Sequence, residues 1–142
     1  MPIVNFHLVE GMSTPEQDER LLIGACQLYA EVLKAPMERI RAFITPHRPG
    51  QFAVAGGLCA QNGLHAPYFE FIVLEGRSLE DRHCLMRRFT DLLVDTLDVR
   101  RDLIRGKCRR VEPQDWAIAG EPASVIRKDE VAARAAQNSP PP

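Results

Sequence analysis

The chain carries one pattern twice, and this repeat limits what it can fold into more than any other feature. A proline, an alternating apolar stretch and Glu-Gly-X-Ser occupy residues 2–13, and the same order returns 65 residues later over 67–78. The ends of the two halves also correspond, with Phe52 aligned to Trp116 at an offset of 64. A repeat of this length indicates a duplicated supersecondary unit, because a solenoid needs at least three stacked copies.

The two copies differ chemically at their first residue. Pro2 follows Met1, and a methionine before a small residue such as proline is normally removed. Pro2 would then carry a free secondary amine, whereas the nitrogen of Pro67 is held in a peptide bond and is not basic. The sequence therefore predicts amine chemistry in the first copy alone.

The composition is that of one globular unit. The 142 residues are 45% hydrophobic and 26% charged, which is enough to bury a core. A net charge of −1 gives no reason to expect a nucleic-acid partner, and no apolar run reaches the length of a membrane span. The four cysteines lack metal-type spacing, and no signal peptide opens the chain. We therefore expect a cytoplasmic protein that needs no metal, cofactor, nucleic acid or membrane.

Each half is predicted to fold as strand, helix, strand. Alternation over 3–9 predicts a strand, and Ser13 or Thr14 can cap the helix that follows. Ser78 caps the second helix in the same way. The remaining predicted elements are a strand over 40–45, a hairpin over 50–57 and a strand over 103–110.

The resulting division of the chain is one domain made of two repeats. The first repeat spans 2–57 and the second spans 67–120, with a linker over 58–66. Residues 121–142 form a C-terminal extension, with room for a short helix over 126–136 and a proline-rich end that we expect to be disordered.

Two such repeats side by side predict an α+β fold. Parallel strands within each unit need a right-handed helical crossover, so both helices cover the same face of a four-stranded sheet. The other face has no cover within the chain. We therefore expect an oligomer in which another copy of the sheet covers it.

Several segments together resemble 4-oxalocrotonate tautomerase over most of its length. They are Pro2-Ile3, Glu10-Gly11, Ile40-Arg41 and Phe52-Ala53-Val54-Ala55-Gly56-Gly57. Residues 76–82 resemble the matching loop of 5-carboxymethyl-2-hydroxymuconate isomerase, and the region of Asp115-Trp116 resembles malonate semialdehyde decarboxylase. The chain thus looks like a fused, double-length member of the tautomerase superfamily, with the likeness covering about residues 2–120. The resemblance implies a homotrimer of fused chains.

The resemblance also implies an active site around Pro2. In that arrangement Pro2 faces Arg77 and Trp116 of the other half, while the blocked Pro67 faces Met12 and Phe52. Arginine is thus present only where a working amine is expected. Arg41 and Arg105 occupy the place of the family's second substrate-binding arginine.

These residues are suited to proton transfer on an anionic substrate. An α-amine titrates nearer neutrality than lysine, and burial and neighbouring cations lower its pKa further. Arg77 offers a fixed fork for a carboxylate or an oxyanion. Lys107 and Arg109 alternate with Arg105 on one strand face and would add positive charge if that face lines the site.

The sequence leaves three functions open. Keto–enol tautomerisation of a small anionic keto acid, with Pro2 as general base and Arg77 beside it, is favoured. Pro2 as general acid, in a decarboxylase- or dehalogenase-like hydratase reaction, is the first alternative. Trp116 stands where the dehalogenases carry a water-activating glutamate, so this alternative has less support. The second alternative is a trimeric binding or scaffold protein without turnover.

Overall fold

Two β-α-β units follow one another in the computed structural model, which describes residues 2–139 and leaves Met1 and residues 140–142 outside the description. In the first unit, α1 (Pro15–Leu33) connects β1 (Ile3–Val9) to β2 (Arg41–His47). In the second unit, α3 (Leu79–Leu97) connects β5 (Tyr68–Leu74) to β6 (Arg105–Val111). The expected disorder of the proline-rich end falls on 140–142, outside the described residues.

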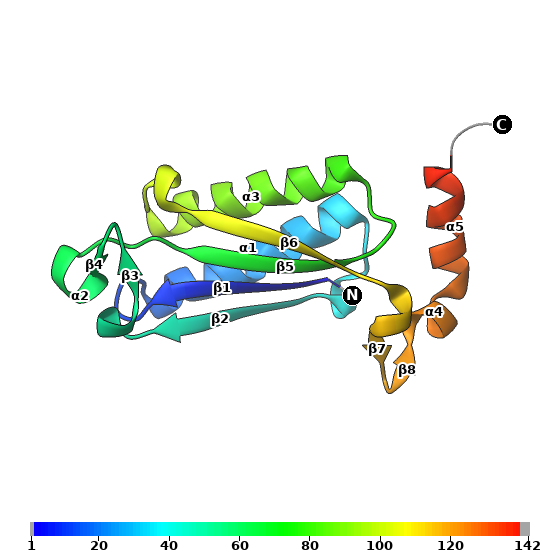
Figure 1. The fold of residues 1–142 in the computed structure, drawn as a ribbon, viewed down its shortest axis with the longest axis horizontal. Coiled ribbons are helices and arrows are strands. Elements are labelled where there is room, and N and C mark those ends of the chain that lie inside the picture. The colour runs from blue at the N-terminus through cyan, green and yellow to red at the C-terminus, as the bar shows by residue number, and fades with distance from the viewer. Residues whose placement is uncertain (1, 140–142) are drawn as a thin grey trace.

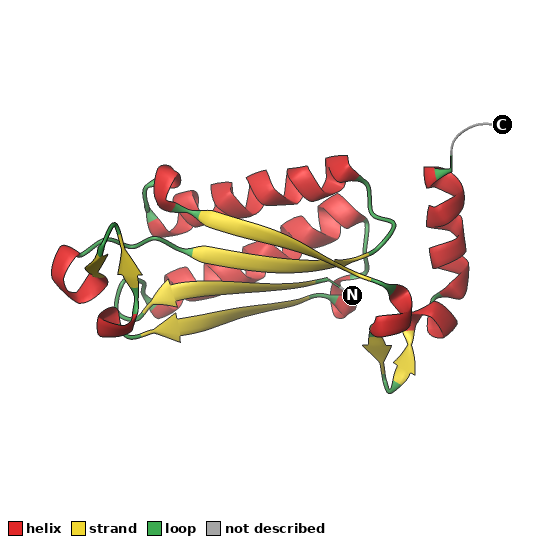
Figure 2. Ribbon diagram, in the orientation of Figure 1, coloured by secondary structure: helices red, strands yellow, loops and turns green. Residues whose placement is uncertain are grey.

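The four long strands form one sheet in the order β2-β1-β5-β6. The strands are parallel within each unit, and β1 and β5 meet antiparallel at the centre. Figures 1 and 2 show α1 and α3 side by side behind this sheet. The predicted α+β fold, with two helices on one face of a four-stranded sheet, is confirmed.

Short elements complete each unit. The first unit holds η1 (Met37–Arg39), η2 (Pro49–Gln51), β3 (Ala53–Val54), β4 (Gly57–Leu58) and α2 (Cys59–Asn62). The second holds η3 (Arg101–Leu103), η4 (Pro113–Asp115), β7 (Ala117–Ile118), β8 (Glu121–Pro122) and α4 (Ala123–Ile126). A last helix, α5 (Lys128–Asn138), follows α4 and stands at the end of the sheet near the N-terminus (Figure 1).

The repeat boundaries differ from those predicted. The segments 58–66 and 121–126 are not linker and extension throughout, because β4 with α2 and β8 with α4 are the same structure at an offset of 64. Buried Cys59 and buried Ala123 begin the two short helices and anchor both hairpins. Each repeat therefore continues to residue 62 or 126, past the ends at 57 and 120 that the sequence predicted.

Capping and amphipathicity explain the two long helices. Thr14, one of the two predicted caps, forms a capping box with Gln17, and the Ser78 side chain accepts a hydrogen bond from the amide of Asp81. Lys34 and Asp98 end the helices in the left-handed conformation at corresponding positions. The buried face joins α1, α3 and the inner face of the sheet in one core, with Tyr29, Phe6, Phe69, Phe71 and Phe89 as its largest side chains.

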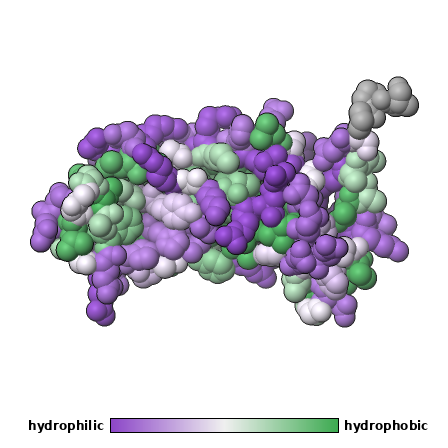
Figure 3. All heavy atoms as spheres, in the orientation of Figure 1, coloured by the Kyte–Doolittle hydropathy of each residue, from purple (hydrophilic) through white to green (hydrophobic). Residues whose placement is uncertain are grey.

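The opposite face of the sheet is open within the chain. It carries a polar network in which His7 Nδ1 and His47 Nε2 lie 2.8 Å apart and Thr45 donates to Asn5. Phe43 on the same face is 47% exposed. The side of the molecule shown in Figure 3 is mainly hydrophilic over the strands, with hydrophobic groups gathered near the hairpins. No helix in the described part of the chain is long and apolar enough to cross a membrane.

The two repeats fill the core differently at one aligned position. In the first repeat Val4 lies opposite Ala42, and in the second Phe69 lies opposite Gly106. A Cβ on Gly106 would lie 2.2 Å from Cζ of Phe69, which is 1% exposed. The larger residue on the central strand thus compensates for the missing side chain on the edge strand.

Gly106→Ala is expected to lower the free energy of unfolding by about 1–3 kcal/mol, because the added Cβ would overlap the buried ring of Phe69 and force it or the edge strand to shift. Gly50→Ala is the matched control, since a Cβ added at Gly50 would meet nothing within 4 Å and the φ of this residue is ordinary. Urea denaturation of both variants measures the difference. Equal stability of the two variants would show that the Phe69–Gly106 pair does not constrain the core.

Candidate active site

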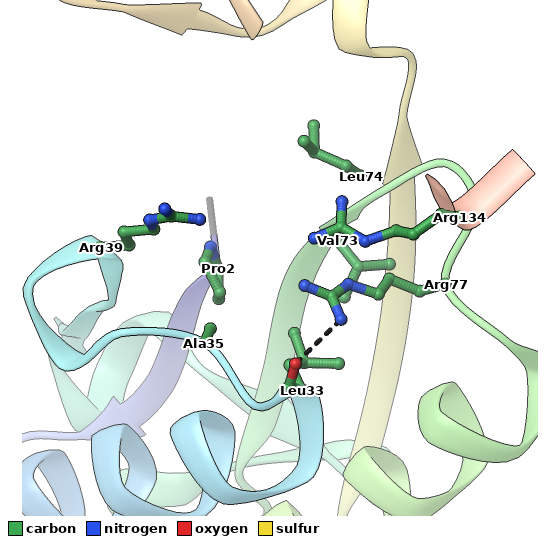
Figure 4. Close-up of a pocket in the computed structure, with 8 residues that line it drawn as sticks. All are labelled: Pro2, Leu33, Ala35, Arg39, Val73, Leu74, Arg77 and Arg134. Atoms are coloured by element: carbon green, nitrogen blue, oxygen red, sulfur yellow. Dashed lines mark hydrogen bonds between the residues drawn. The ribbon is translucent and has the colours of Figure 1, made fainter. Parts of the chain in front are cut away.

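Pro2 lies in a cavity formed where both repeats meet the C-terminal helix (Figure 4). Because β1 and β5 are antiparallel, with Ile3 opposite Ile72, the start of β1 lies beside the end of β5. The loop after β5 therefore brings Arg77 to Pro2. The full lining is Pro2, Leu33, Ala35, Arg39, Val73, Leu74, Arg77 and Arg134, and these side chains leave a space of about 20 Å³.

Tyr29 joins the two central strands in the core near this cavity. Its hydroxyl lies within 3.3 Å of the carbonyl oxygen of Ile3 and also contacts that of Ile72, so it joins β1 to β5 next to Pro2. The residue is fully buried, and burial holds the pKa of its phenol well above the ordinary value. Tyr29 is a neutral hydrogen-bond donor of the core.

Arg77 is held by the end of α1. Its Nη1 donates a hydrogen bond of 2.9 Å to the carbonyl of Leu33, one of the carbonyls that a helix end leaves unpaired. Burial, followed by the neighbouring Arg134 cation, lowers the pKa of Arg77 to about 10, while Asp81 and Glu130 act in the opposite direction. The side chain is thus charged at neutral pH and only partly hydrated, which strengthens its attraction for an anion.

Two further arginines face Pro2, and both were absent from the predicted site. Arg39 in η1 donates from Nη1 and Nη2 to the carboxylate of Glu130, at 3.1 and 3.2 Å. Arg134 reaches the same cavity from α5 (Figure 4). The only sequence signal for Arg134 is its i,i+4 spacing from Glu130 within a helical stretch, and such spacing says nothing about where the helix packs.

Trp116 lies in a larger cavity next to that of Pro2. This cavity has a volume of about 410 Å³, shares Arg39 with the first, and also contains Ile3, Arg41 and Arg127. The side-chain nitrogens Trp116 Nε1 and Arg127 Nε are buried there without a hydrogen-bond partner in the described part of the chain.

The register of the sheet places the two predicted strand arginines, Arg41 and Arg105, at opposite ends of the sheet. Arg41 lies opposite Ile3, at the same end of the sheet as Pro2, and it lines the cavity of Trp116. Arg105 lies opposite Tyr68, at the far end of β5, where it donates to the carbonyls of Asp102 and Ile104. Lys107 follows Arg105 on this edge strand. Within one chain, Arg105 and Lys107 are therefore not brought to Pro2.

The equivalent cavity in the other half has lost its positive charge at the matching positions. Met12 and Leu103 stand where the Pro2 cavity has Arg77 and Arg39. Residues 63–65 enter this second cavity, and the ring of His65 accepts a hydrogen bond from the amide of Val9. Phe52 packs edge-on against His47 instead, with ring centroids 5.7 Å apart.

The described residues contain no cluster of three or more His, Cys, Asp or Glu side chains placed to hold a metal ion. The cavity of Pro2 is instead lined by guanidinium groups and apolar side chains. Such a site can bind an anion.

Comparisons with known proteins agree with this geometry. The family model described as "Tautomerase enzyme" matches residues 2–62. The 2-hydroxymuconate tautomerase of Pseudomonas sp. (strain CF600) is 38% identical over 56 residues, which cover 39% of this chain and 87% of that protein. The crystal structure of native fused 4-OT overlaps with a TM-score of 0.80 at 19% identity, covering 88% of this chain and 98% of the other. A fused 4-OT symmetric trimer overlaps with a TM-score of 0.79 at 21% identity, covering 87% and 98%.

The family-model match covers the first repeat, which holds Pro2, and the structural matches extend over both repeats. The 38% identical relative is a short protein, of which the match covers 87%. The overlap with the fused structure accounts for the double length. The chain therefore belongs to the tautomerase superfamily, as a fused, double-length isomerase with two β-α-β repeats in one polypeptide.

Proposed function

We propose that this tautomerase uses the amine of Pro2 as a general base on a small anionic keto acid. The observation that carries the proposal is the charge of the cavity: three arginines and no carboxylate stand among its lining residues. Cations and apolar walls both disfavour a protonated amine, so Pro2 without Met1 would be neutral near pH 7. A neutral secondary amine is a suitable proton shuttle at that pH.

The proton transfer follows from this arrangement. The lone pair of Pro2 takes the hydroxyl proton of the enol, the C–O bond becomes a carbonyl, and the C=C electrons move to the neighbouring carbon. The prolyl ammonium then returns its proton to that carbon, so no atom is gained or lost. Arg77 stabilises the negative charge that develops on oxygen during the transfer.

The cavity of Trp116 gives room for the rest of the substrate. Its volume of about 410 Å³ lies in the range of small-molecule sites. Arg41 and Trp116 would contact the distal part of the acid there. The relatives are named 2-hydroxymuconate tautomerase, and this name supports a small unsaturated hydroxy acid as the substrate class.

A homotrimer is the assembly we propose. The open sheet face exposes Phe43 beside a polar network, and the fused 4-OT neighbours include trimers. In such an assembly Arg105 and Lys107 would serve the Pro2 site of another copy, since they lie far from Pro2 in their own chain. Sedimentation velocity at micromolar concentration should show a trimer, and a stable monomer would contradict the assembly.

A residue left in front of Pro2 is expected to lower kcat/KM by about 10²–10⁴-fold, because an amide nitrogen is not a base. Pro2→Ala should also reduce activity strongly, while Pro67→Ala should leave it nearly unchanged. Ketonisation of phenylenolpyruvate measures all three, and a mass spectrum of the purified protein establishes whether Met1 is removed. Full activity with a blocked terminus would exclude amine catalysis, and a retained Met1 would favour a binding protein without turnover.

The activity is expected to rise with pH and then level off, because the base must lose its proton before it can act. The apparent pKa should lie below that of a free prolyl amine, since Arg39, Arg77 and Arg134 disfavour the cation. A pH profile of kcat/KM for phenylenolpyruvate measures it. A rate that falls as the same group deprotonates, together with turnover of a β-keto acid or a halogenated acrylate, would assign Pro2 as a general acid.

Arg77→Ala is expected to lower kcat/KM for carboxylate substrates by about 30- to 1000-fold, which corresponds to losing a charge-assisted contact of about 2–4 kcal/mol. Met12→Ala, at the aligned position of the other half, should have little effect. Steady-state kinetics of both variants on the same enol acid provides the comparison. Similar small effects at both positions would show that the two half-sites do not differ as proposed.

A further inference from the structure

Helix α5 is fastened to the rim of the Pro2 cavity by contacts on both sides. Glu130, near its start, pairs with both terminal nitrogens of Arg39 in η1. Asn138, its last residue, donates a hydrogen bond of 2.6 Å to the carbonyl of Gly76, the residue before Arg77. The described helix has no fully buried residue of its own. Specific polar contacts around the cavity, and not core burial, therefore set its position.

Arg134 lies between these two anchors and points into the cavity. Its side chain is only 19% exposed, and its Cβ lies 3.5 Å from the position that a Cβ on Gly76 would take. Figure 4 shows the guanidinium groups of Arg134 and Arg77 side by side, both directed towards Pro2. The first repeat has no helix at the position of α5, so this contact is not a product of the duplication.

The donors of Arg134 are largely unused. The carboxylate that pairs with it is that of Glu130, at 3.8 Å from Nη2, and both oxygens of this carboxylate are already engaged by Arg39. Among the described residues no hydrogen-bond acceptor pairs with the Arg134 guanidinium. Arg77 uses one of its N–H donors for the carbonyl of Leu33, and its other donors remain available. Two like charges in one small cavity repel each other, and an anion between them would remove that repulsion.

We propose that Arg134 binds the carboxylate of the substrate together with Arg77, so that α5 is a part of the active site. This inference builds on the proposed function, because it assigns a second binding residue for the same acid. Two planar forks that face one carboxylate can each donate to a different oxygen, and this fixes both its position and its plane. The enol carbon skeleton is then held at a set orientation to the Pro2 nitrogen.

The alternative is that Arg134 only supports the helix. The contacts themselves argue against this, because Glu130 and Asn138 already fasten α5 on either side. A supporting residue would also be expected to use its donors within the protein. The two roles differ in a measurable way: a binding residue affects only ligands that carry a carboxylate, whereas a supporting residue affects all ligands alike.

The test compares binding of 3-phenylpropanoate with that of 3-phenylpropanamide to the full chain by titration calorimetry. The two ligands share one skeleton and have no enol, so Pro2 chemistry plays no part. Arg134→Gln should weaken binding of the acid by about 10- to 100-fold and leave the amide unchanged. Arg134→Lys should restore part of the affinity, because it keeps the charge but not the fork.

Lys128→Gln is the matched control, since it removes the same charge from an exposed position of the same helix. It should leave both affinities unchanged. Equal loss for acid and amide in Arg134→Gln, unchanged acid binding in that variant, or no preference of the wild-type chain for the acid would each overturn the inference.

Kinetics with phenylenolpyruvate then separates this inference from the proposed function. Arg134→Gln should raise KM more than it lowers kcat, because Pro2 and Arg77 remain. Acid binding that depends on Arg134 in a chain without turnover would support the binding residue and contradict the proposed function. Turnover that depends on Pro2 and Arg77 but not on Arg134 would support the proposed function and contradict the role of Arg134 as a binding residue.

Discussion

The antiparallel contact between β1 and β5 is the interaction on which the site depends. It joins two parallel β-α-β units into one sheet and places the start of β1 against the end of β5. Tyr29 strengthens this contact from within the core, since its hydroxyl contacts carbonyl oxygens of both strands. A single pairing in the centre of the sheet thus decides that Pro2 of one repeat meets Arg77 of the other.

The duplication has produced two cavities with different linings from one fold. The cavity of Pro2 is lined by three arginines, whereas the equivalent cavity has Met12 and Leu103 at the matching positions and receives residues 63–65. Burying a charge costs free energy unless the charge has a partner. The retention of arginines beside Pro2, which we propose to be a free amine, is therefore consistent with chemistry at this site alone. The aligned core pair Phe69–Gly106 shows that the second copy has also repacked its interior.

The C-terminal helix adds an element for which the repeat has no counterpart. Through Glu130, Arg134 and Asn138 the helix contacts η1, the cavity and the loop after β5. A short helix with no fully buried residue depends on such contacts, because its own propensity is too small to position it.

The sequence by itself determined the repeat, the helix caps, the alternation of the strands and the chemical difference between Pro2 and Pro67, because all of these depend on local order along the chain. The expectation that Arg77 lies near Pro2 came from the resemblance to the tautomerases, because no local pattern relates the two repeats in space. Local patterns could not show that Arg41 lies at the Pro2 end of the sheet and Arg105 at the other, since this depends on strand register. Nor could they place Arg39 and Arg134 in one cavity: these residues are 95 positions apart, and only the packing of α5 against the end of the sheet, with Glu130 paired to Arg39, brings them together.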